Sequence, residues 1–349
     1  MTIEVVKPGL FTTLQDAGRA GFAHLGIGRA GAFDAPALRI ANALAGNPAK
    51  ACALEITLLG PTLRFRRGAW IAVTGAPMVF RIDRVDAPMW APVWVPAGCD
   101  VQFGAMQVGC RAYLAAAGGF DAESVLGSRS TDANARLGPL GGRPLRAGDL
   151  LEIASERGSG SLFQNVPWSQ SVPGKSEPDP LSAPGESEPD PINWRIDPRP
   201  WFADDTRRPL RLLPGSHFDN LIEDSRKLLF SATFKVHPDS NRVGIRLSGP
   251  KLEWSSPIEM VSEGCVPGLL QLPPSGQPIA FGPECPVSGG YPRLGQIAAV
   301  DLPRLAQRRP GDALRFTRCT FDDALRVLHA RERALQNLED AIRRRLKAY

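Results

Sequence analysis

Three clusters of polar residues stand out because glycines surround side chains that could do chemistry. The first runs from Pro8 to Asp34 and places Gln15, Asp16 and Arg19 among six glycines. Glycine at this density indicates a backbone that turns tightly or approaches another group closely. Asp16 is a candidate general base or metal-bound carboxylate. A set of tight turns held by an Asp16–Arg19 ion pair explains the same residues, so both interpretations stay open.

The second cluster is Gly127–Asp132, with the sequence GSRSTD. Arg129 could bind a phosphate or carboxylate, because its planar guanidinium lies beside the hydroxyls of Ser130 and Thr131. Asp132 is a second candidate general base or metal-bound carboxylate. The alternative is an ordinary Ser/Thr turn in which Asp132 pairs with Arg129.

The third cluster lies within Ser288–Arg293. Its residues Ser288, Gly289, Gly290 and Tyr291 could supply backbone N–H donors to a developing oxyanion. A glycine-rich β-turn is the competing interpretation.

Composition excludes several classes of protein. The sequence contains no HExxH, GxSxG or EF-hand motif, and Gly174-Lys175-Ser176 is no phosphate loop, because Ser169 stands where that motif needs glycine. The six cysteines form no CxxC pair, which predicts reduced thiols, a cytoplasmic location and no metal site. No window reaches the length of a transmembrane helix, so no membrane partner is expected.

The formal net charge of +5 is concentrated in the tail. Residues 326–349 contain seven Lys or Arg and three Asp or Glu. The rest of the chain is close to neutral, which argues against a nucleic-acid partner.

The elements that position these clusters are predicted to be mostly short strands. The chain has 35 Gly and 33 Pro, which favours strands joined by turns over a helical bundle. One helix is expected from Asp34 and Pro36 to Gly46. In residues 1–153, a first β-barrel subdomain, the expected strands are Thr2–Val6, Leu54–Leu59, Thr62–Phe65, Trp70–Thr74, Met78–Ile82, Val101–Phe103, Arg111–Ala115 and Leu150–Ile153. In residues 209–318, a second one, they are Leu210–Leu213, Leu229–Val236, Gly244–Leu247, Pro257–Val261, Leu269–Leu272, Ile279–Phe281, Gln296–Val300 and Ala313–Phe316.

The two β-rich regions share motifs in the same order, which indicates an internal duplication. Gly60–Phe65 matches Gly249–Trp254, and a final Gly-Asp turn precedes the last strand of each region. The second region has no counterpart of LQDAGRAG, so a barrel fold did not require that segment twice. We therefore expect the first cluster to form a site rather than turns alone.

Residues 154–208 are expected to be a flexible proline-rich linker. They contain the near-repeat PGKSEPDP and PGESEPDP, with little to bury. Residues 319–349 are expected to form an amphipathic helix, which Thr320 and Asp323 cap. Its apolar stripe is predicted from a seven-residue repeat, made of Phe321, Leu328, Leu335 and Ile342.

Several motifs together resemble a known family. They are KPGLFTTLQDAGRAGFAHLGIGRAGAFD, ALRIANALAGN, ALEITLLGPTLRF, GSRSTD, GGRPLRAGD, HPDSNRVGIRL, PVSGGYPRLG and DLPRLAQRRPGD. The chain resembles the KipA family, also known as the C subunit of the ATP-dependent 5-oxoprolinase. It is also similar to one half of the carboxyltransferase region of urea carboxylase.

The resemblance implies two cyclophilin-like β-barrel subdomains. The implied partners are a KipI-like B subunit, a lactam-utilisation-like A subunit, and ATP, with or without Mg. The implied reaction is hydrolysis of a cyclic amide, in which the 5-oxoproline lactam opens to glutamate while ATP is hydrolysed. The expected catalytic residues are Asp16, Arg19, Arg129 and Asp132. The expected substrate-binding residues are Gln15, Asp34, Ser130, Thr131, Ser288, Gly289, Gly290 and Tyr291.

Two alternatives stay open for the function. One is a non-catalytic regulatory protein that captures a KipI-like kinase inhibitor. The other is a carboxyltransferase component that uses a separate biotin carrier. The third cluster reads Val287-Ser288 where many family members have two threonines, which leaves room for a different amide substrate.

Overall fold

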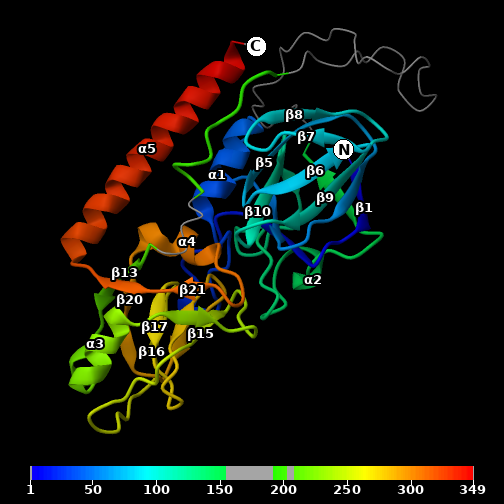
Figure 1. The fold of residues 1–349 in the computed structure, drawn as a ribbon. Helices are drawn as coiled ribbons and strands as arrows, with labels where there is room; N and C mark the ends of the chain where they lie inside the picture. The colour runs from blue at the N-terminus through cyan, green and yellow to red at the C-terminus, as the bar shows by residue number, and fades with distance from the viewer. Residues whose placement is uncertain (1, 155–191, 203–207, 349) are drawn as a thin grey trace. The chain divides into compact units, whose positions relative to one another are not determined.

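The computed structural model describes residues 2–154, 192–202 and 208–348 (Figure 1). The chain divides into two compact units built from separate stretches of sequence. The first comprises Met1–Ala17, Ala35–Phe202 and Gln336–Tyr349, and the second comprises Gly18–Asp34 and Ala203–Leu335. The expected linker at 154–208 falls largely outside the described residues. The expected domain boundaries stay a prediction.

The first unit contains two antiparallel sheets. The seven-stranded sheet has the order β11-β12-β1-β4-β9-β6-β7, and the five-stranded sheet has the order β2-β3-β10-β5-β8. The strands are β1 (Thr2–Lys7), β2 (Phe11–Gln15), β3 (Ala53–Thr57), β4 (Thr62–Phe65), β5 (Ala69–Gly75), β6 (Met78–Ile82), β7 (Val85–Ala87), β8 (Pro92–Val95), β9 (Asp100–Met106), β10 (Arg111–Ala116), β11 (Phe120–Asp121) and β12 (Leu150–Ile153).

Alternating side chains build the core of this unit. Leu54 and Ile56 of β3 and Leu114 of β10 point to one face of the five-stranded sheet and join a single apolar cluster with Ile3 and Val5 of β1. The opposite face of the same sheet carries polar side chains instead. This alternation is the period of two that a strand imposes.

Helix α1 (Ala35–Leu44) packs on β5 and β10, on that polar face (Figure 1). The Thr74 hydroxyl donates to the Ala37 carbonyl at 2.7 Å. The helix ends as expected before Gly46, whose φ of +71° is left-handed. A short turn, α2 (Pro139–Gly142), precedes β12.

The second unit is organised by an eight-stranded sheet of order β21-β14-β15-β18-β17-β20-β13-β22. Its edge strands β21 and β22 are separated only by Arg315, so the sheet nearly closes into a barrel. The strands are β13 (Leu210–Pro214), β14 (Phe234–Val236), β15 (Gly244–Ser248), β17 (Leu269–Gln271), β18 (Ile279–Phe281), β20 (Arg293–Ile297), β21 (Ala313–Leu314) and β22 (Phe316–Arg318). The remaining elements are β16 (Glu263–Gly264), β19 (Ser288–Gly289), α3 (Glu223–Ser231), α4 (Leu302–Ala306), η1 (Ala23–Leu25), η3 (Phe218–Asn220) and η4 (Ala299–Asp301).

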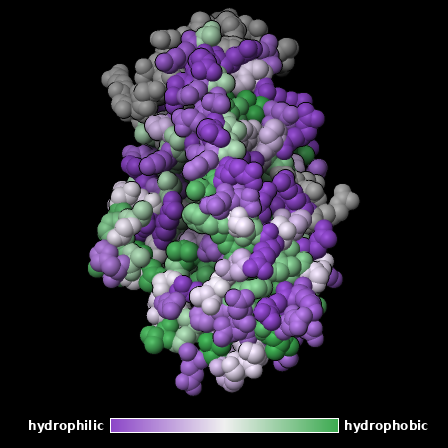
Figure 2. All heavy atoms as spheres, turned by 90° about the vertical axis from the view of Figure 1, so that its left-hand side faces the viewer, coloured by the Kyte–Doolittle hydropathy of each residue, from purple (hydrophilic) through white to green (hydrophobic). Residues whose placement is uncertain are grey.

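The C-terminal helix α5 (Phe321–Lys347) begins with the expected cap. The Asp323 N–H donates to Thr320 Oγ1 at 3.2 Å, and the Thr320 hydroxyl donates to the Asp323 carboxylate at 2.8 Å. Leu335 and Ile342 are buried, whereas Phe321 is 68% exposed and lies outside the buried stripe. Hydrophilic side chains cover much of the face on which this helix lies (Figure 2). In the described part of the chain, no helix is both long and apolar enough to span a membrane.

Two strand predictions are wrong, and Gln296–Val300 is a strand only at Gln296 and Ile297, because β20 ends there and η4 begins at Ala299. The run Leu229–Val236 is split between the end of α3 and strand β14. The helix is favoured by Glu223 in its first turn, which also pairs with Lys227 one turn later at 2.5 Å. Pro257–Val261 forms no strand, and Val261 is 85% exposed, so this apolar run packs on no sheet.

Candidate functional site

The first and second clusters meet at the end of β2 in the first unit. The Asp16 carboxylate accepts hydrogen bonds from the Ser128 hydroxyl at 2.6 Å, the Ser130 hydroxyl at 2.5 Å and the Arg129 backbone N–H at 2.6 Å. The Asp16 N–H in turn donates to Ser130 Oγ at 3.0 Å. Asp16 is only 8% exposed. Its carboxylate therefore organises the GSRSTD loop.

Glycines allow this loop to fold back on itself. Gly138 has a φ of +112°, and a Cβ on it would lie 2.3 Å from the Ser130 carbonyl oxygen. Gly142 has a φ of +67°, and its Cβ would lie 2.1 Å from the Arg136 carbonyl carbon. Both positions need glycine for space as well as for backbone conformation.

Gln15 has a buried side-chain oxygen that accepts no hydrogen bond from the described residues. Its Nε2 donates to Thr13 Oγ1 at 3.0 Å and to the Thr131 carbonyl at 2.9 Å. The side chain is fully buried, and within the described residues its Oε1 has no hydrogen-bond partner. A buried acceptor without a donor is costly unless a ligand or water supplies one.

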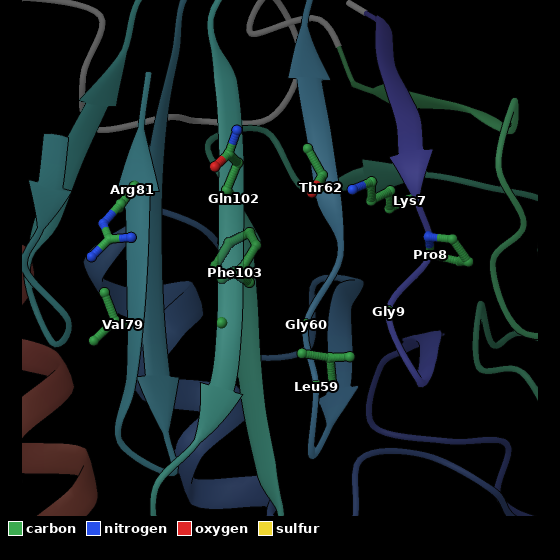
Figure 3. A pocket seen from close by; sticks show the side chains of 11 residues that line it. Lys7, Pro8, Gly9, Leu59, Gly60, Thr62, Val79, Arg81, Gln102 and Phe103 are labelled. Atoms are coloured by element: carbon green, nitrogen blue, oxygen red, sulfur yellow. The ribbon is translucent and has the colours of Figure 1, made fainter. Parts of the chain in front are cut away.

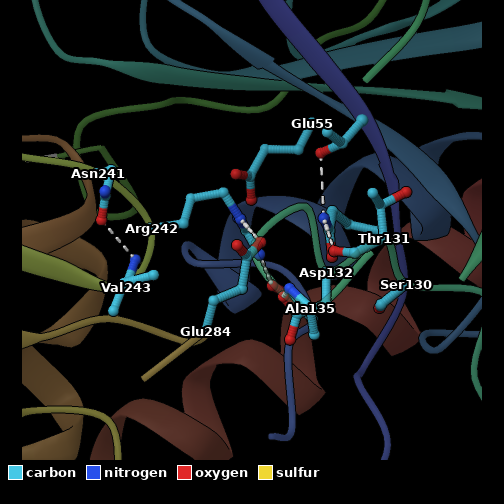
Figure 4. Close-up of polar contacts among 12 residues, drawn as sticks. Glu55, Ser130, Thr131, Asp132, Ala135, Asn241, Arg242, Val243 and Glu284 are labelled. Carbon is cyan, nitrogen blue, oxygen red and sulfur yellow. Dashed lines mark hydrogen bonds and ion pairs between the residues drawn. The ribbon is translucent and has the colours of Figure 1, made fainter. Parts of the chain in front are cut away.

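Arg129 and Asp132 point away from the Asp16 carboxylate. The Arg129 Nε donates to the Ala122 carbonyl at 2.9 Å, and its Nη2 lies 3.4 Å from Asp121. Asp132 Oδ1 accepts from the Ala135 N–H at 2.9 Å and so caps its own turn (Figure 4). Their expected catalytic roles stay predictions.

The same face of the five-stranded sheet carries a polar row that the sequence analysis missed. Register aligns Thr13, Glu55, Tyr113 and Thr74 across four neighbouring strands. The Tyr113 hydroxyl donates to Glu55 Oε2 at 2.7 Å, and Arg111 Nε lies 3.4 Å from Glu55 Oε1. All five side chains are at least nine-tenths buried. The sequence signal for this row is Glu55, an acidic residue in the middle of the otherwise apolar run ALEIT.

Burial also affects a thiol beside Asp16. Burial and the neighbouring carboxylate of Asp16 raise the pKa of the Cys52 thiol far above its ordinary value. The Cys52 Sγ lies 3.8 Å from the Arg129 carbonyl oxygen. Cys52 is therefore a neutral packing group rather than a nucleophile.

The second unit holds the remaining members of the first cluster. Arg19 is 2% exposed, and its N–H donates to the Arg29 carbonyl at 2.8 Å. Asp34 is also 2% exposed and accepts from Gln307 Nε2 at 2.7 Å. Both side chains are thus buried in ordered surroundings.

A buried ion pair holds this segment on the second unit. Arg242 Nε lies 2.5 Å from Glu284 Oε1, and Arg242 Nη2 donates to the Gly31 carbonyl at 2.6 Å. Figure 4 shows the pair of Arg242 and Glu284. Both side chains are 4% exposed, so water solvates neither charge to any large extent.

The third cluster forms an exposed turn on the second unit. Ser288–Gly289 pairs with Glu263–Gly264 as a two-stranded sheet, and Gly290 and Tyr291 are exposed. Arg293 ties the pair together, because its Nη2 contacts the Gly264 carbonyl and the Glu263 carboxylate, each at 2.8 Å. The expected role of this turn as an oxyanion donor stays a prediction.

This face of the five-stranded sheet in the first unit holds two kinds of buried polar group. Gln15 Oε1 is an acceptor without a hydrogen-bond partner in the described residues, and the Tyr113 hydroxyl donates to the Glu55 carboxylate. Among the described residues, no three His, Cys, Asp or Glu side chains lie close enough together to hold a metal ion.

Comparisons with known proteins identify the family. Residues 25–318 match the family described as carboxyltransferase domain, subdomain A and B. The chain is 35% identical to the 5-oxoprolinase C subunit of Escherichia coli (strain K12), over 96% of this chain and 97% of the relative. It is 32% identical to the 5-oxoprolinase C subunit of Haemophilus influenzae, over 95% of each chain.

A solved structure shares the fold. The K. lactis urea amidolyase matches with a TM-score of 0.79 and 28% identity over 97% of this chain. This chain corresponds to only 20% of that protein. By its matching residues and its full-length relatives, the chain belongs to the carboxyltransferase domain subdomain A and B family.

Proposed function

We propose that this chain is the C subunit of an ATP-dependent 5-oxoprolinase. The observation that carries the proposal is its relation to the C subunits of two 5-oxoprolinases, which it matches over 97% and 95% of their lengths. Relatives that align from end to end support a shared role better than relatives of which the chain is a small part.

The proposed chemistry gives ATP a definite task. A lactam amide is a poor electrophile, so water opens it slowly. Transfer of the terminal phosphoryl group from ATP to the lactam oxygen releases ADP and makes the ring carbon electrophilic. Water then adds to that carbon, and the ring C–N bond breaks as the nitrogen takes a proton, which leaves a glutamyl acyl phosphate. A second water hydrolyses this acyl phosphate to glutamate and phosphate. Magnesium that accompanies ATP would take phosphate oxygens and water among its ligands.

The proposed roles of the residues follow from their positions. Gln15 Oε1 would accept the lactam N–H, since it is buried without a donor in the described residues. Asp16 would hold Ser130 and Thr131 against the substrate. Arg19, Asp34, Arg129, Asp132 and the Ser288–Tyr291 turn remain proposed site residues, for which residue type and the family resemblance are the support.

The proposal includes partners and an internal duplication. We expect a KipI-like B subunit and a lactam-utilisation-like A subunit to complete the enzyme. Two cyclophilin-like barrels joined by the proline-rich linker are the proposed architecture, and shared motifs support it. In the first unit the Gly98 N–H donates to the Phe65 carbonyl, and in the second the Leu252 N–H donates to the Gly276 carbonyl. The segment after each Gly-Pro motif thus lies beside a Pro-X-Gly turn, Pro96–Gly98 in the first unit and Pro274–Gly276 in the second.

The test is 5-oxoproline-dependent phosphate release by the three co-expressed subunits. We expect ADP, phosphate and glutamate in equal amounts. Gln15→Met should raise KM about tenfold, whereas the exposed control Lys235→Glu should leave turnover unchanged. An intact complex without activity above background would contradict the proposal. A loss smaller than about threefold for Arg129→Ala would remove Arg129 from the site.

The similarity to urea amidolyase favours one second candidate, a carboxyltransferase component. This alternative predicts transfer of a carboxyl group from carboxybiotin on a separate carrier to a urea-like amide. Purified chain, a carrier that already holds carboxybiotin, and urea would give carboxylated urea and the free biotinylated carrier, and 5-oxoproline would not be consumed.

A further inference from the structure

A straight polar row crosses the outer face of the seven-stranded sheet. Register pairs Lys7 with Thr62, Thr62 with Gln102, and Gln102 with Arg81, on strands β1, β4, β9 and β6. Residues directly opposite each other in neighbouring strands point to the same face. Figure 3 shows these four side chains along the pocket that they help to line. Three of the four are exposed, and Thr62 is half-buried.

This row is positively charged. No acidic residue lines the pocket, which Lys7 and Arg81 enter from the two ends of the row. Lys7 has no ion-pair partner among the described residues. Arg81 uses only its Nε, at 2.6 Å from Asp86. Two cations at opposite ends of one pocket favour a ligand that carries more than one carboxylate.

The neighbouring row on the same face is neutralised within itself. Arg64 pairs with Asp100 through two bonds of 2.8 and 3.1 Å, and Arg66 pairs with Glu4 at 3.2 Å. Lys7 therefore carries a charge that no acidic side chain balances in the described residues, whereas Arg81 already pairs with Asp86 through its Nε. This contrast separates the pocket from an ordinary mixed-charge surface.

Two exposed aliphatic side chains, Leu59 and Val79, also line the pocket, and Leu10 adjoins Leu59. Leu10 is 63% exposed, Leu59 is 47% exposed and Val79 is 42% exposed. The Leu10 N–H donates to the Leu59 carbonyl at 2.9 Å, and Leu59 bridges to Ala105 of β9, the strand beside β6. Gly104 contributes no side chain, so the floor between Leu59 and Val79 stays open. The pocket has a volume of about 650 Å³.

We propose that this face, named here the Lys7–Arg81 groove, docks an acidic segment of the KipI-like partner. Carboxylates of the partner would pair with Lys7 and Arg81, and its aliphatic side chains would cover Leu10, Leu59 and Val79. Exposed apolar side chains bordered by polar and charged ones are typical of a protein interface. The proposal rests on the proposed function, because it assumes that this chain is one subunit of a larger enzyme.

The test measures binding to the purified KipI-like partner by titration calorimetry. We expect Lys7→Glu with Arg81→Glu to weaken the affinity at least tenfold, and the affinity of the unsubstituted chain to fall with salt. Leu10→Ser with Leu59→Ser should weaken it about fivefold without a change in charge. The matched control is Lys235→Glu with Arg246→Glu, two exposed strand residues of the second unit, which should bind within threefold of the unsubstituted chain.

The outcomes separate this inference from the proposed function. A folded groove variant that binds the KipI-like partner with the affinity of the unsubstituted chain overturns the groove, even where the complex turns over 5-oxoproline. Absence of any binding by the unsubstituted chain also overturns it. Binding that the groove variant loses, in a complex that has no 5-oxoprolinase activity, supports the groove and contradicts the proposed reaction.

Discussion

Asp16 owes its importance to the donors that surround it. Its carboxylate accepts two hydroxyls and one backbone N–H of residues 128–130. Asn at this position keeps one acceptor oxygen and turns an N–H₂ group toward these donors. We predict that Asp16→Asn lowers the free energy of unfolding by about 2 kcal/mol, because hydrogen bonds to a charged group are among the stronger ones.

Urea denaturation measures this loss. The control is Asp121→Asn, which removes an exposed carboxylate 3.4 Å from Arg129 and should change stability by less than about 0.5 kcal/mol. Equal stability of Asp16→Asn and the unsubstituted protein would show that the loop does not depend on this carboxylate.

Residue type and glycine context singled out Gln15, Asp16 and residues 128–132, and the structure brings these residues into contact. Such reasoning works where a polar side chain is unusual for its local context. It overlooked Glu55 and Tyr113, because their partnership depends on register between β3 and β10. It also could not see that the Arg129 guanidinium turns toward Ala122, since the direction of a side chain depends on the folded loop.

At the scale of an element, the loop from Gly127 to Gly142 depends on particular glycines. Gly138 and Gly141 both have left-handed φ values, of +112° and +69°. A Cβ on Gly138 would lie 2.3 Å from the Ser130 carbonyl oxygen, whereas a Cβ on Gly141 would meet nothing within 4 Å. We predict that Gly138→Ala costs about 3 kcal/mol and Gly141→Ala about 1 kcal/mol.

The pair is its own control, because both variants add the same methyl group. Thermal and urea unfolding provide the measurement. Equal losses would mean that backbone conformation alone matters and that the approach to Ser130 costs nothing.

The turn before β12 gives the protein a local pH dependence. The Arg143 side chain lowers the pKa of Asp149, with two bonds of 2.7 Å, and the Arg146 N–H adds to this effect. The ionised Asp149 carboxylate therefore stabilises the fold at pH values above its pKa in the unfolded chain, which is near 4. This stabilisation is lost as the pH falls through the lower pKa that Asp149 has in the folded protein. We predict that Asp149→Asn is about 1 kcal/mol less stable at pH 7.

The difference in the free energy of unfolding between Asp149→Asn and the unsubstituted protein should shrink as the pH falls below about 4. Urea titrations at a series of pH values test this. A difference that stays constant down to the acid limit would exclude the ion pair as its origin. Arg143→Gln should reproduce the effect at pH 7, because it removes the other partner.

Local patterns predicted elements well where a strand had one apolar face. Thr62–Phe65, Met78–Ile82 and Ile279–Phe281 have the predicted bounds. Local patterns failed at Leu229–Val236, because a short apolar run fits a strand or the end of a helix equally well. Strand β2 was not predicted, because its polar Thr13 and Gln15 are buried by tertiary packing.

At the scale of the whole chain, the segment 18–34 shows how distant residues complete a unit. It lies about two hundred residues before Arg242, yet it belongs to the second unit, and the Arg242 Nη2 donates to the Gly31 carbonyl at 2.6 Å. Glycine spacing suggested that the segment approaches another group closely. The identity of that group could not be read from sequence, because it follows from the closure of the eight-stranded sheet.

We predict that Arg242→Met frees this segment and destabilises the second unit. The substitution leaves the Glu284 carboxylate, 4% exposed, without its 2.5 Å partner. A buried charge that loses its partner typically costs about 3–5 kcal/mol, because the remaining charge is left uncompensated. The Arg19 N–H, bonded to the Arg29 carbonyl at 2.8 Å, reports on the segment, and its hydrogen exchange should become at least tenfold faster.

Arg246→Met is the matched control, because Arg246 is an exposed arginine on β15. Its exchange rates within 18–34 should equal those of the unsubstituted protein. Replacement of both members of the pair, Arg242→Met with Glu284→Leu, should recover much of the lost stability, since neither charge of the pair is left buried without the other. It should not slow exchange at Arg19, because the bond to Gly31 is still absent. Recovery of both quantities together would mean that the unpaired Glu284 carboxylate of Arg242→Met, rather than the lost contact with Gly31, frees the segment.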